Sequence, residues 1–190
     1  MRKNMNQRRI WVFFLSVIVF GTNLAFSQNM EIRKDFPIEV IEGYIMPFLE
    51  DIPDDVLPDY GIKNRDEIRK STIGRPIAVY TLEQGALSFT DTWRIPLIVD
   101  DEYRALFTVF KSCNNEYKIV EFGAVLLAEE FFKFEKEHDF SAMLRVYELR
   151  KDFFISSKRA GEYLFYPVPS SKEKGYRMDE IIEMIKREGL

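Results

Sequence analysis

The chain has 190 residues, with 27 basic residues, 31 acidic residues and a single histidine, which gives a net charge of −4. A hydrophobic share of 46% with 17 phenylalanines is enough for a sizeable apolar core. The only cysteine, Cys113, excludes an internal disulfide, and one cysteine with one histidine excludes the usual Cys- and His-rich zinc sets.

The N-terminal segment has the layout of a secretory signal peptide. Four basic residues and no acidic one precede an apolar run of 11 residues, Ile10–Phe20. Small residues occupy the −3 and −1 positions of a cut between Ser27 and Gln28. A retained anchor is the alternative, although a spanning helix needs about 20 apolar residues. We expect residues 1–27 to be removed and residues 28–190 to be exported, to a periplasm or to the extracellular space.

Removal of the leader makes the remaining chain more acidic. Residues 1–27 hold four of the 27 basic residues and none of the 31 acidic ones, so residues 28–190 carry 23 basic and 31 acidic residues, a net charge of −8. Binding to nucleic acid and to anionic membranes both require clustered Lys and Arg. The expected partners therefore include neither, and we expect no membrane span after cleavage. One domain over 28–190 is predicted, with a disordered start at 28–34.

Short helices are expected first. The apolar spacing over 37–52 predicts a helix, either continuous or divided at Gly43 and Pro47. A turn-rich connector at 53–61 then leads to one or two helical turns at 66–71.

An antiparallel meander is expected next. Its four strands are predicted at 77–82, 93–99, 103–111 and 117–122. Asp100-Asp101 and Asn114-Asn115 suit the tight turns between the last three strands. Strands joined by such short turns must be antiparallel neighbours, because parallel strands need long crossovers. We expect this sheet to turn one face to helices and the other mostly to water.

A long helix over 124–138 follows the meander. Its apolar stripe is formed by Leu127, Phe131, Phe134 and His138, at helical spacing. The meander supplies the surface that this stripe needs. The predicted fold class is therefore α+β, with an antiparallel β-meander sheet packed against a long helix.

A further hairpin and a closing helix complete the prediction. Strands at 144–156 and 163–168 form the hairpin, and Pro167 indicates a sheet edge or a strand end. The helix at 178–188 is amphipathic. It either docks on its own sheet or reaches a partner.

The sequence offers few candidates for a catalytic or metal-binding site. A dyad of Cys113 and His138, oriented by Asn114 or Asn115, would resemble a thiolate nucleophile with its base. However, Cys113 is predicted at a hairpin tip, where nothing lowers its pKa, so a spectator thiol is the preferred interpretation. An acidic string could attract calcium, but it lacks the alternating oxygen ligands and central glycine of a calcium loop and is interpreted as solvated; it consists of Glu50, Asp51, Asp54, Asp55 and Asp59. We therefore assign no catalytic residue, no metal ligand and no cofactor.

Aromatic residues near the last predicted hairpin are the better lead. We single out Phe154, Tyr163, Tyr166 and Tyr176 as a binding surface for a protein or an extended peptide. The alternative is a sheet that is covered on both sides, in which these side chains belong to the core.

Residues 73–128 have a recognisable sequence pattern: IGRPIAVYTL, then WRIPLIVDDEYRALFTV, then YKIVEFGAVLLAEE. This pattern resembles the sequences of small exported bacterial α+β domains of the cystatin-like and PepSY-like kind. The resemblance implies a helix paired with an antiparallel sheet and a role as inhibitor, chaperone or propeptide of secreted proteases. The cystatin loop Gln-x-Val-x-Gly does not occur, so no functional residue is carried over.

Two hypotheses for function follow. The first is an exported, non-catalytic binding module that interacts with a secreted or envelope protein. The alternative is a small secreted hydrolase that uses carboxylates or Cys113, or a protease inhibitor or propeptide-like domain. A hydrolase requires a cleft lined by convergent polar groups.

Overall fold

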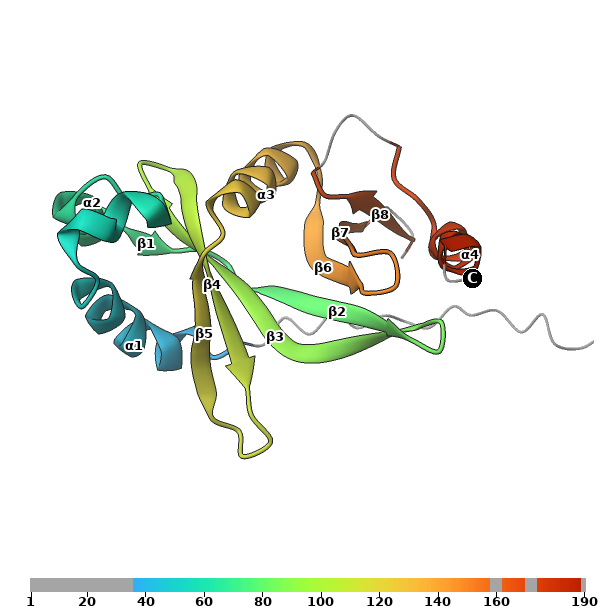
Figure 1. The fold of residues 1–190 in the computed structure, drawn as a ribbon, viewed down its shortest axis with the longest axis horizontal. Coiled ribbons are helices and arrows are strands. Elements are labelled where there is room, and N and C mark those ends of the chain that lie inside the picture. The colour runs from blue at the N-terminus through green and yellow to red at the C-terminus, as the bar shows by residue number, and fades with distance from the viewer. Residues whose placement is uncertain (1–35, 158–161, 170–173, 189–190) are drawn as a thin grey trace, which may run out of the picture. The chain divides into compact units, whose positions relative to one another are not determined.

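The computed structural model describes residues 36–157, 162–169 and 174–188 (Figure 1). The predicted signal peptide and the predicted disordered start lie outside these residues. The helices are α1 (Ile38–Glu50), the 3-10 helix η1 (Asp54–Tyr60), α2 (Arg65–Lys70), α3 (Val125–Glu137) and α4 (Met178–Glu188). The strands are β1 (Thr72–Ile73), β2 (Ile77–Glu83), β3 (Ala86–Val99), β4 (Glu102–Lys111), β5 (Tyr117–Gly123), β6 (Phe140–Val146), β7 (Lys151–Ser157) and β8 (Tyr163–Pro167).

All eight strands belong to one sheet. Seven follow the order β5-β4-β3-β2-β6-β7-β8, and β1 pairs with β3. Strands β2 to β5 are the predicted antiparallel meander. Asp100 and Asp101 have φ values of 51° and 60°, the left-handed conformation that a two-residue hairpin turn requires at both positions. The α+β prediction is thus confirmed.

The last three strands extend this sheet rather than form a separate hairpin. β6 lies parallel to β2, with Val79 opposite Met143. The chain reaches that position through α3, because β6 lies beyond β2, on the other side of the meander from β5, and a tight turn cannot span that distance. β7 and β8 then add antiparallel neighbours, and β8 ends at Pro167, as predicted.

The predicted strand at 144–156 is wrong in its extent. The chain turns at 147–150, which separates β6 from β7. Arg150 supplies the left-handed residue of this turn with φ of 50°, so no glycine or asparagine marks it. Tyr147 lies in this turn and is 64% exposed. β3 is longer than predicted, because it begins directly after the Gln84-Gly85 turn.

One face of the sheet packs against α3. A cluster on this face joins Phe131 and Phe134 of α3 to buried residues of β2, β4, β6 and β7: Ile77, Val79, Leu106, Phe140, Met143 and Phe154. Phe131 lies 5.0 Å from Phe154 and 5.1 Å from Phe140, ring centre to ring centre. The predicted stripe is therefore confirmed at its two central positions.

The opposite face is also covered, which corrects the expectation that it would face water. Phe107 follows Leu106 in β4 and so points away from α3. It packs against Phe48 of α1 and Phe122 of β5, with ring centres 6.0 and 4.3 Å apart. The uninterrupted burial of Trp93–Leu97 in β3, Arg94 included, has the same origin, because a strand covered on both faces buries successive positions.

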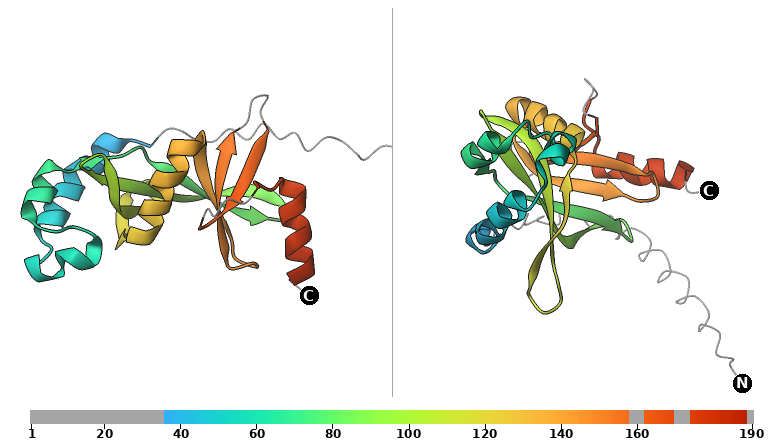
Figure 2. Two further views of the ribbon diagram at one scale, coloured as in Figure 1. Left: turned by 90° about the horizontal axis from the view of Figure 1, so that it is seen from above. Right: turned by 60° about the vertical axis from the view of Figure 1, so that its left-hand side comes forward.

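Two of the open alternatives are resolved by packing. α1 is one helix that continues through Pro47. α4 docks on its own sheet, where Ile181 is fully buried, and Figure 2 shows this helix beside β7 and β8. Lys151 of β7 forms an ion pair with Glu188 of α4 at 3.9 Å.

The α3 interface provides a stability test. Phe131→Ala removes a fully buried ring and leaves a cavity, so we expect the free energy of unfolding to fall by about 3–5 kcal/mol. Leu126→Ala on the same helix is the matched control, because Leu126 is 79% exposed, and its effect should stay within about 0.5 kcal/mol. Urea denaturation monitored by circular dichroism measures both. Equal effects of the two substitutions would contradict this packing.

Candidate functional site

α1 is apolar around more of its circumference than it buries. Its inner row is fully buried and consists of Ile41, Ile45 and Leu49. A second row, one position earlier at the same spacing, is exposed; this outer stripe consists of Val40, Tyr44 and Phe48, which are 45%, 64% and 38% exposed. A helix with one buried face normally carries polar residues elsewhere. The outer stripe is therefore an exposed apolar surface that the packing of this domain does not explain.

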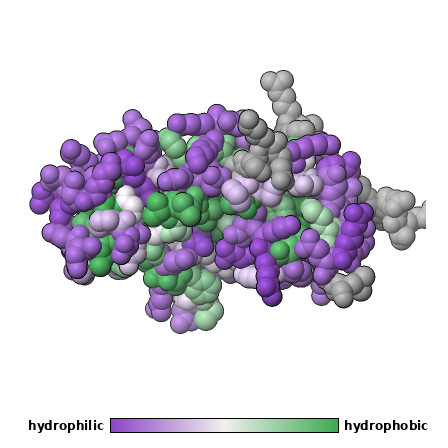
Figure 3. Space-filling model, turned by 45° about the horizontal axis from the view of Figure 1, so that its top comes forward, coloured by the Kyte–Doolittle hydropathy of each residue, from purple (hydrophilic) through white to green (hydrophobic). Residues whose placement is uncertain are grey.

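Other exposed apolar side chains are scattered. Among the described residues they occur singly in β4, β5, α3 and the β6–β7 turn, as Phe110, Val120, Leu126 and Tyr147. Figure 3 shows hydrophobic residues interrupting a largely hydrophilic surface on the face where α3 lies. Single exposed apolar residues are normal on soluble domains. Three in one helical row are a different feature, so we take the outer stripe as the candidate site.

The C-terminal end of the outer stripe packs against the core. Phe48 makes edge contacts with Phe107 and Phe122, whose ring centres lie 6.0 and 5.7 Å away. Tyr60 of η1 stacks on Phe122 at 5.1 Å. These contacts fix the rotation of α1 about its axis, and with it the direction in which Tyr44 points outward.

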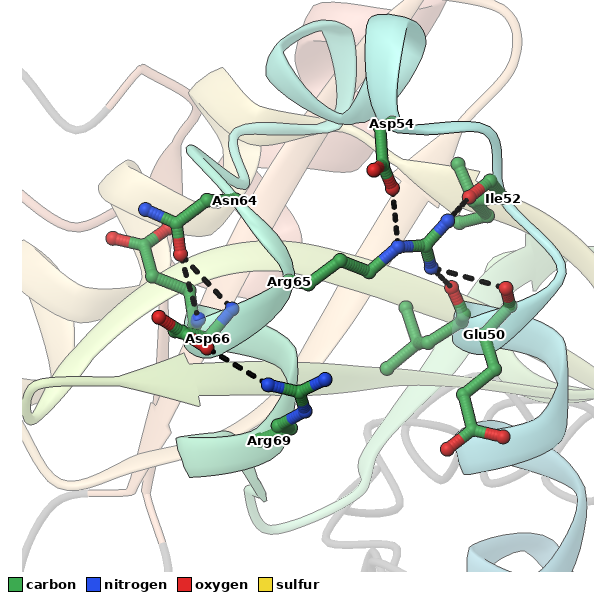
Figure 4. A network of polar contacts seen from close by, with 9 residues as sticks. Glu50, Ile52, Asp54, Asn64, Arg65, Asp66 and Arg69 are labelled. Atoms are coloured by element: carbon green, nitrogen blue, oxygen red, sulfur yellow. Dashed lines mark hydrogen bonds and ion pairs between the residues drawn. The ribbon is translucent and has the colours of Figure 1, made fainter.

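A clasp around Arg65 holds the C-terminal end of α1 (Figure 4). The guanidinium of Arg65 donates hydrogen bonds to the carbonyl oxygens of Leu49 and Glu50, both at 3.0 Å, and to that of Ile52. Its Nε also donates to the carboxylate of Asp54. The last carbonyls of a helix have no partners within the helix, and a cation near them is favoured by the helix dipole. Arg65 satisfies both requirements, since the last turn of α1 contains no basic residue.

Arg65 itself is positioned by the start of α2. The side-chain oxygen of Asn64 accepts hydrogen bonds from the backbone N–H groups of Asp66 and Glu67, at 3.0 and 3.1 Å. This is an ordinary N-cap, which begins a helix at the next residue. The carboxylate of Glu67 in turn accepts a hydrogen bond from the backbone N–H of Lys63 at 2.7 Å. Arg65 therefore projects from a fixed first turn toward α1.

The charges around the outer stripe are of one sign. Residues 36–62 hold seven acidic residues and no basic one; the acids are Glu39, Glu42, Glu50, Asp51, Asp54, Asp55 and Asp59. All seven are exposed. The other residues of 28–190 hold the remaining 24 acidic residues and all 23 basic ones. Nearly all of the net negative charge of 28–190 therefore lies in the segment that carries the outer stripe.

A separate polar row crosses the sheet. Arg94 of β3, Thr108 of β4 and Glu121 of β5 lie opposite one another in register. The Glu121 carboxylate accepts hydrogen bonds from Arg94 at 2.6 Å and from Thr108 at 2.8 Å. Arg145 of β6 forms a two-pronged ion pair with Asp152 of β7, at 2.8 and 2.9 Å. These contacts join neighbouring strands.

The electrostatics of this row suit an ion pair. The hydrogen bond from Thr108 lowers the pKa of Glu121, burial opposes this effect, and the hydrogen bond and charge of Arg94 lower the pKa further. The charge of Arg145 acts in the same direction. A lowered pKa keeps Glu121 ionised near neutral pH, whereas a general acid needs a raised one. The row therefore stabilises the sheet and carries no catalytic assignment.

The last polar cluster ties α3 to its neighbours. The hydroxyl of Tyr103 in β4 donates to the carboxylate of Glu135 in α3. Burial raises the pKa of Tyr103, and this hydrogen bond raises it further. Arg75 pairs with Glu135 at 3.4 Å and donates to the carbonyl of Phe140 at 2.5 Å.

The four aromatic residues predicted as a binding surface are packed to different degrees. Phe154 is fully buried and belongs to the α3 cluster, so it offers no free surface. Tyr166 is half-buried between Phe134, at 5.1 Å, and His138, at 4.6 Å. A Cβ atom at Gly175 would lie 2.7 Å from the Tyr166 ring, so residues 174–176 cover its other side.

Tyr163 and Tyr176 are also half-buried. Tyr176 pairs with Phe165 of β8 through two backbone hydrogen bonds of 2.8 and 2.9 Å. The structure thus places the predicted residues around β8, mostly under other segments. Sequence reasoning predicted the helix over 37–52 but did not separate its two apolar rows, so it missed the outer stripe. The double apolar row was nevertheless visible in IEVIEGYIMPFLE.

Cys113 and His138 are not brought together. Cys113 is exposed in the β4–β5 turn, and its sulfur lies 3.7 Å from the side-chain oxygen of Asn114. His138 ends α3, where its ring stacks on Phe134 at 4.3 Å. The β4–β5 turn and α3 lie at opposite ends of the view in Figure 1.

The described residues offer neither a metal-binding cluster nor a membrane-spanning helix. No group of three or more His, Cys, Asp or Glu residues in this part of the chain could hold a metal ion. No helix among the same residues is long and apolar enough to cross a membrane.

No family model matches the chain, and neither a curated protein nor a solved structure matches it significantly. The resemblance of residues 73–128 to cystatin-like and PepSY-like domains stays a prediction.

The Arg65 clasp can be tested by a charge-conserving change. Arg65→Lys keeps the charge but loses the planar fork that reaches three carbonyls at once. We expect the free energy of unfolding to fall by about 1–3 kcal/mol, and amide exchange near Ile52 to accelerate. Arg69→Lys is the control, because Arg69 is 77% exposed and pairs only with Asp66, so it should cost under about 0.5 kcal/mol. Indistinguishable variants would rule the clasp out as a stabilising contact.

The Arg94–Glu121 pair predicts a pH dependence. Because the pKa of Glu121 is lower in the folded state than its ordinary value of 4.5, the ionised carboxylate stabilises the fold above about pH 4.5. This stabilisation is lost as the pH falls through the folded pKa. Glu121→Gln should therefore cost only about 1 kcal/mol near neutral pH, since Glu121 is 54% exposed, and less at about pH 3.

Denaturation of both proteins across this pH range measures the gap in stability. Glu116→Gln is the control, since Glu116 is 62% exposed and pairs with Lys118 at 3.6 Å, and it should leave stability nearly unchanged. A gap for Glu121→Gln that stays constant with pH would contradict the assignment.

Proposed function

We propose that this chain is an exported, non-catalytic binding module that engages a secreted or envelope protein through the outer stripe of α1. One observation carries the proposal: α1 exposes Val40, Tyr44 and Phe48 beside a fully buried inner row. Exposing three large apolar side chains in one row has a cost in water, which binding of a partner removes.

The shape of the outer stripe supports this role. Residues four apart on a helix form a continuous ridge, which packs into the groove of a partner helix or into an apolar groove. Tyr44 lies at the centre of the ridge, with Val40 and Phe48 on either side. Tyrosine is one of the residues enriched at the energetic centres of interfaces, and such centres are surrounded by contacts that exclude water.

The support for rigidity comes from the clasp and from the core. Arg65 fixes the C-terminal turn of α1, and Phe48 is held against Phe107 and Phe122. A surface that is already ordered loses little conformational entropy on binding. The proposal that the chain is exported rests on the predicted signal peptide. Export makes a secreted or envelope protein the expected kind of partner.

The test compares two equally exposed tyrosines. Tyr44 and Tyr147 are each 64% exposed, but Tyr147 lies in the β6–β7 turn, outside the outer stripe. The tagged full chain is purified from the exported fraction of its host as wild type, Tyr44→Ser and Tyr147→Ser. We expect one discrete partner to be retained by wild type and Tyr147→Ser, and to fall about tenfold or more with Tyr44→Ser.

Thermal melts establish that both variants remain folded, as expected for exposed positions. Equal retention of the partner by the two variants would refute the outer stripe as the binding surface. Loss of the partner in both variants would refute it as well, since the effect would not depend on α1.

A further inference from the structure

We infer that the outer stripe recognises a cationic amphipathic helix, one that carries Lys or Arg beside its own apolar ridge. This inference rests on the proposed function and adds the chemical class of the partner. It is argued from two independent features of α1 and η1: the exposed ridge and the sign of the surrounding charge.

The first step is where the charge lies. The segment 36–62 holds seven acidic residues and no basic one, while the rest of 28–190 is close to neutral, with 24 acidic and 23 basic residues. Lys63 directly follows this segment and pairs with Glu67 at 3.8 Å, and Arg65 is engaged by Asp54 and by backbone carbonyls. The negative charge is therefore a property of this one surface rather than of the whole domain.

The second step is where these acids lie relative to the ridge. With about 100° of rotation per residue, Glu39 and Glu50 lie roughly 120–140° around α1 from the centre of the outer stripe, on the helix face that points away from both apolar rows. Asp51, directly after α1, continues the line of Val40, Tyr44 and Phe48. The ridge thus has the inner row and the domain on one side and a carboxylate at its C-terminal end.

The third step is which occupant fits this arrangement. A partner helix that lays an apolar ridge along the outer stripe places its flanking residues in the negative field of this segment, with Asp51 at the end of the ridge, so Lys or Arg is favoured there and acids are repelled. A second copy of the chain would bring two acidic segments together. An anionic membrane would be repelled for the same reason.

The experiment uses two synthetic helical peptides that share one leucine ridge and differ only in having Lys or Glu at the flanking positions. Binding to the tagged full chain is measured by fluorescence anisotropy at low and at physiological salt. We expect the Lys peptide to bind at least about tenfold more tightly than the Glu peptide, and its affinity to fall as salt rises. Tyr44→Ser should weaken the Lys peptide about tenfold.

Two double variants separate a local effect from a general charge effect. Glu39→Gln with Asp51→Asn should weaken the Lys peptide about three- to tenfold, because the carboxylate next to Val40 and the one in line with the ridge lose their charge. Glu129→Gln with Glu137→Gln is the control on α3, where both residues are exposed, and it should leave the affinity unchanged. Folding of all variants is verified by thermal melts.

Several results would overturn the inference. These are equal affinity for the two peptides, equal effects of the two double variants, self-association that Tyr44→Ser abolishes, and binding that begins only when residues 1–27 have been removed. The last two results would assign the outer stripe to a second copy or to the leader. If any of them is found while the natural partner is still lost with Tyr44→Ser, the proposed function stands without a cationic helix. If Tyr44→Ser also retains the natural partner, both fail.

Discussion

Burial of two aromatic rings of α3 is the interaction on which the rest of the structure depends. Phe131 and Phe134 pack on Phe154, with ring centres 5.0 and 4.8 Å away, and Phe154 belongs to β7, far along the chain from the meander. The same α3 surface contacts Ile77 and Val79 of β2. A single helix therefore packs against both halves of the sheet, on either side of the parallel pairing of β6 with β2.

The covering of the other face sets the geometry of the candidate site. The inner row of α1 buries against the sheet, and Phe48 inserts its ring edge toward Phe107 and Phe122. Once the inner row is buried, the outer stripe must face outward, because the two rows differ by only one position on the same helix. The Arg65 clasp adds a directional restraint, since three carbonyls and a carboxylate accept from one planar group.

The polar contacts of this domain have two different roles. The Arg65 clasp satisfies helix-end carbonyls and orders the segment that bears the outer stripe. The Arg94–Glu121 pair and the Arg145–Asp152 pair join adjacent strands. Arg94 is the only member of these pairs that is nearly inaccessible, at 8% exposure, so its partner matters more than the exposed pairs on α2 or α4 do.

Local sequence signals predicted elements best where the turn chemistry was explicit. Asp100-Asp101 marked the β3–β4 turn, and the apolar spacing of α3 and α4 located both helices. β3 was predicted to begin at residue 93, although Gln84-Gly85 forms a two-residue turn directly before its true start, with φ values of 52° and 80°. The β6–β7 turn had no such signal, because Arg150 takes the left-handed conformation without the usual glycine or asparagine.

The candidate site shows the same division. The residues 154, 163, 166 and 176 were predicted as a surface from aromatic content alone, and packing of α3 and of residues 174–176 decided how far each is covered. By contrast, the sequence showed that the helix at 37–52 has more apolar residues than one buried face needs. It did not show which of the two apolar rows of this helix would be buried.

The sequence by itself determined the element types, the antiparallel meander, the amphipathic stripe of α3 and the excess of acid over base, because periodicity, turn residues and charge are local properties of the chain. Only the tertiary structure decided that β6 joins β2 in parallel, that both faces of the sheet are covered, and that the outer stripe of α1 is left exposed. These outcomes depend on which apolar surfaces meet across long sequence separations, and burial energy is shared among residues that no local pattern connects.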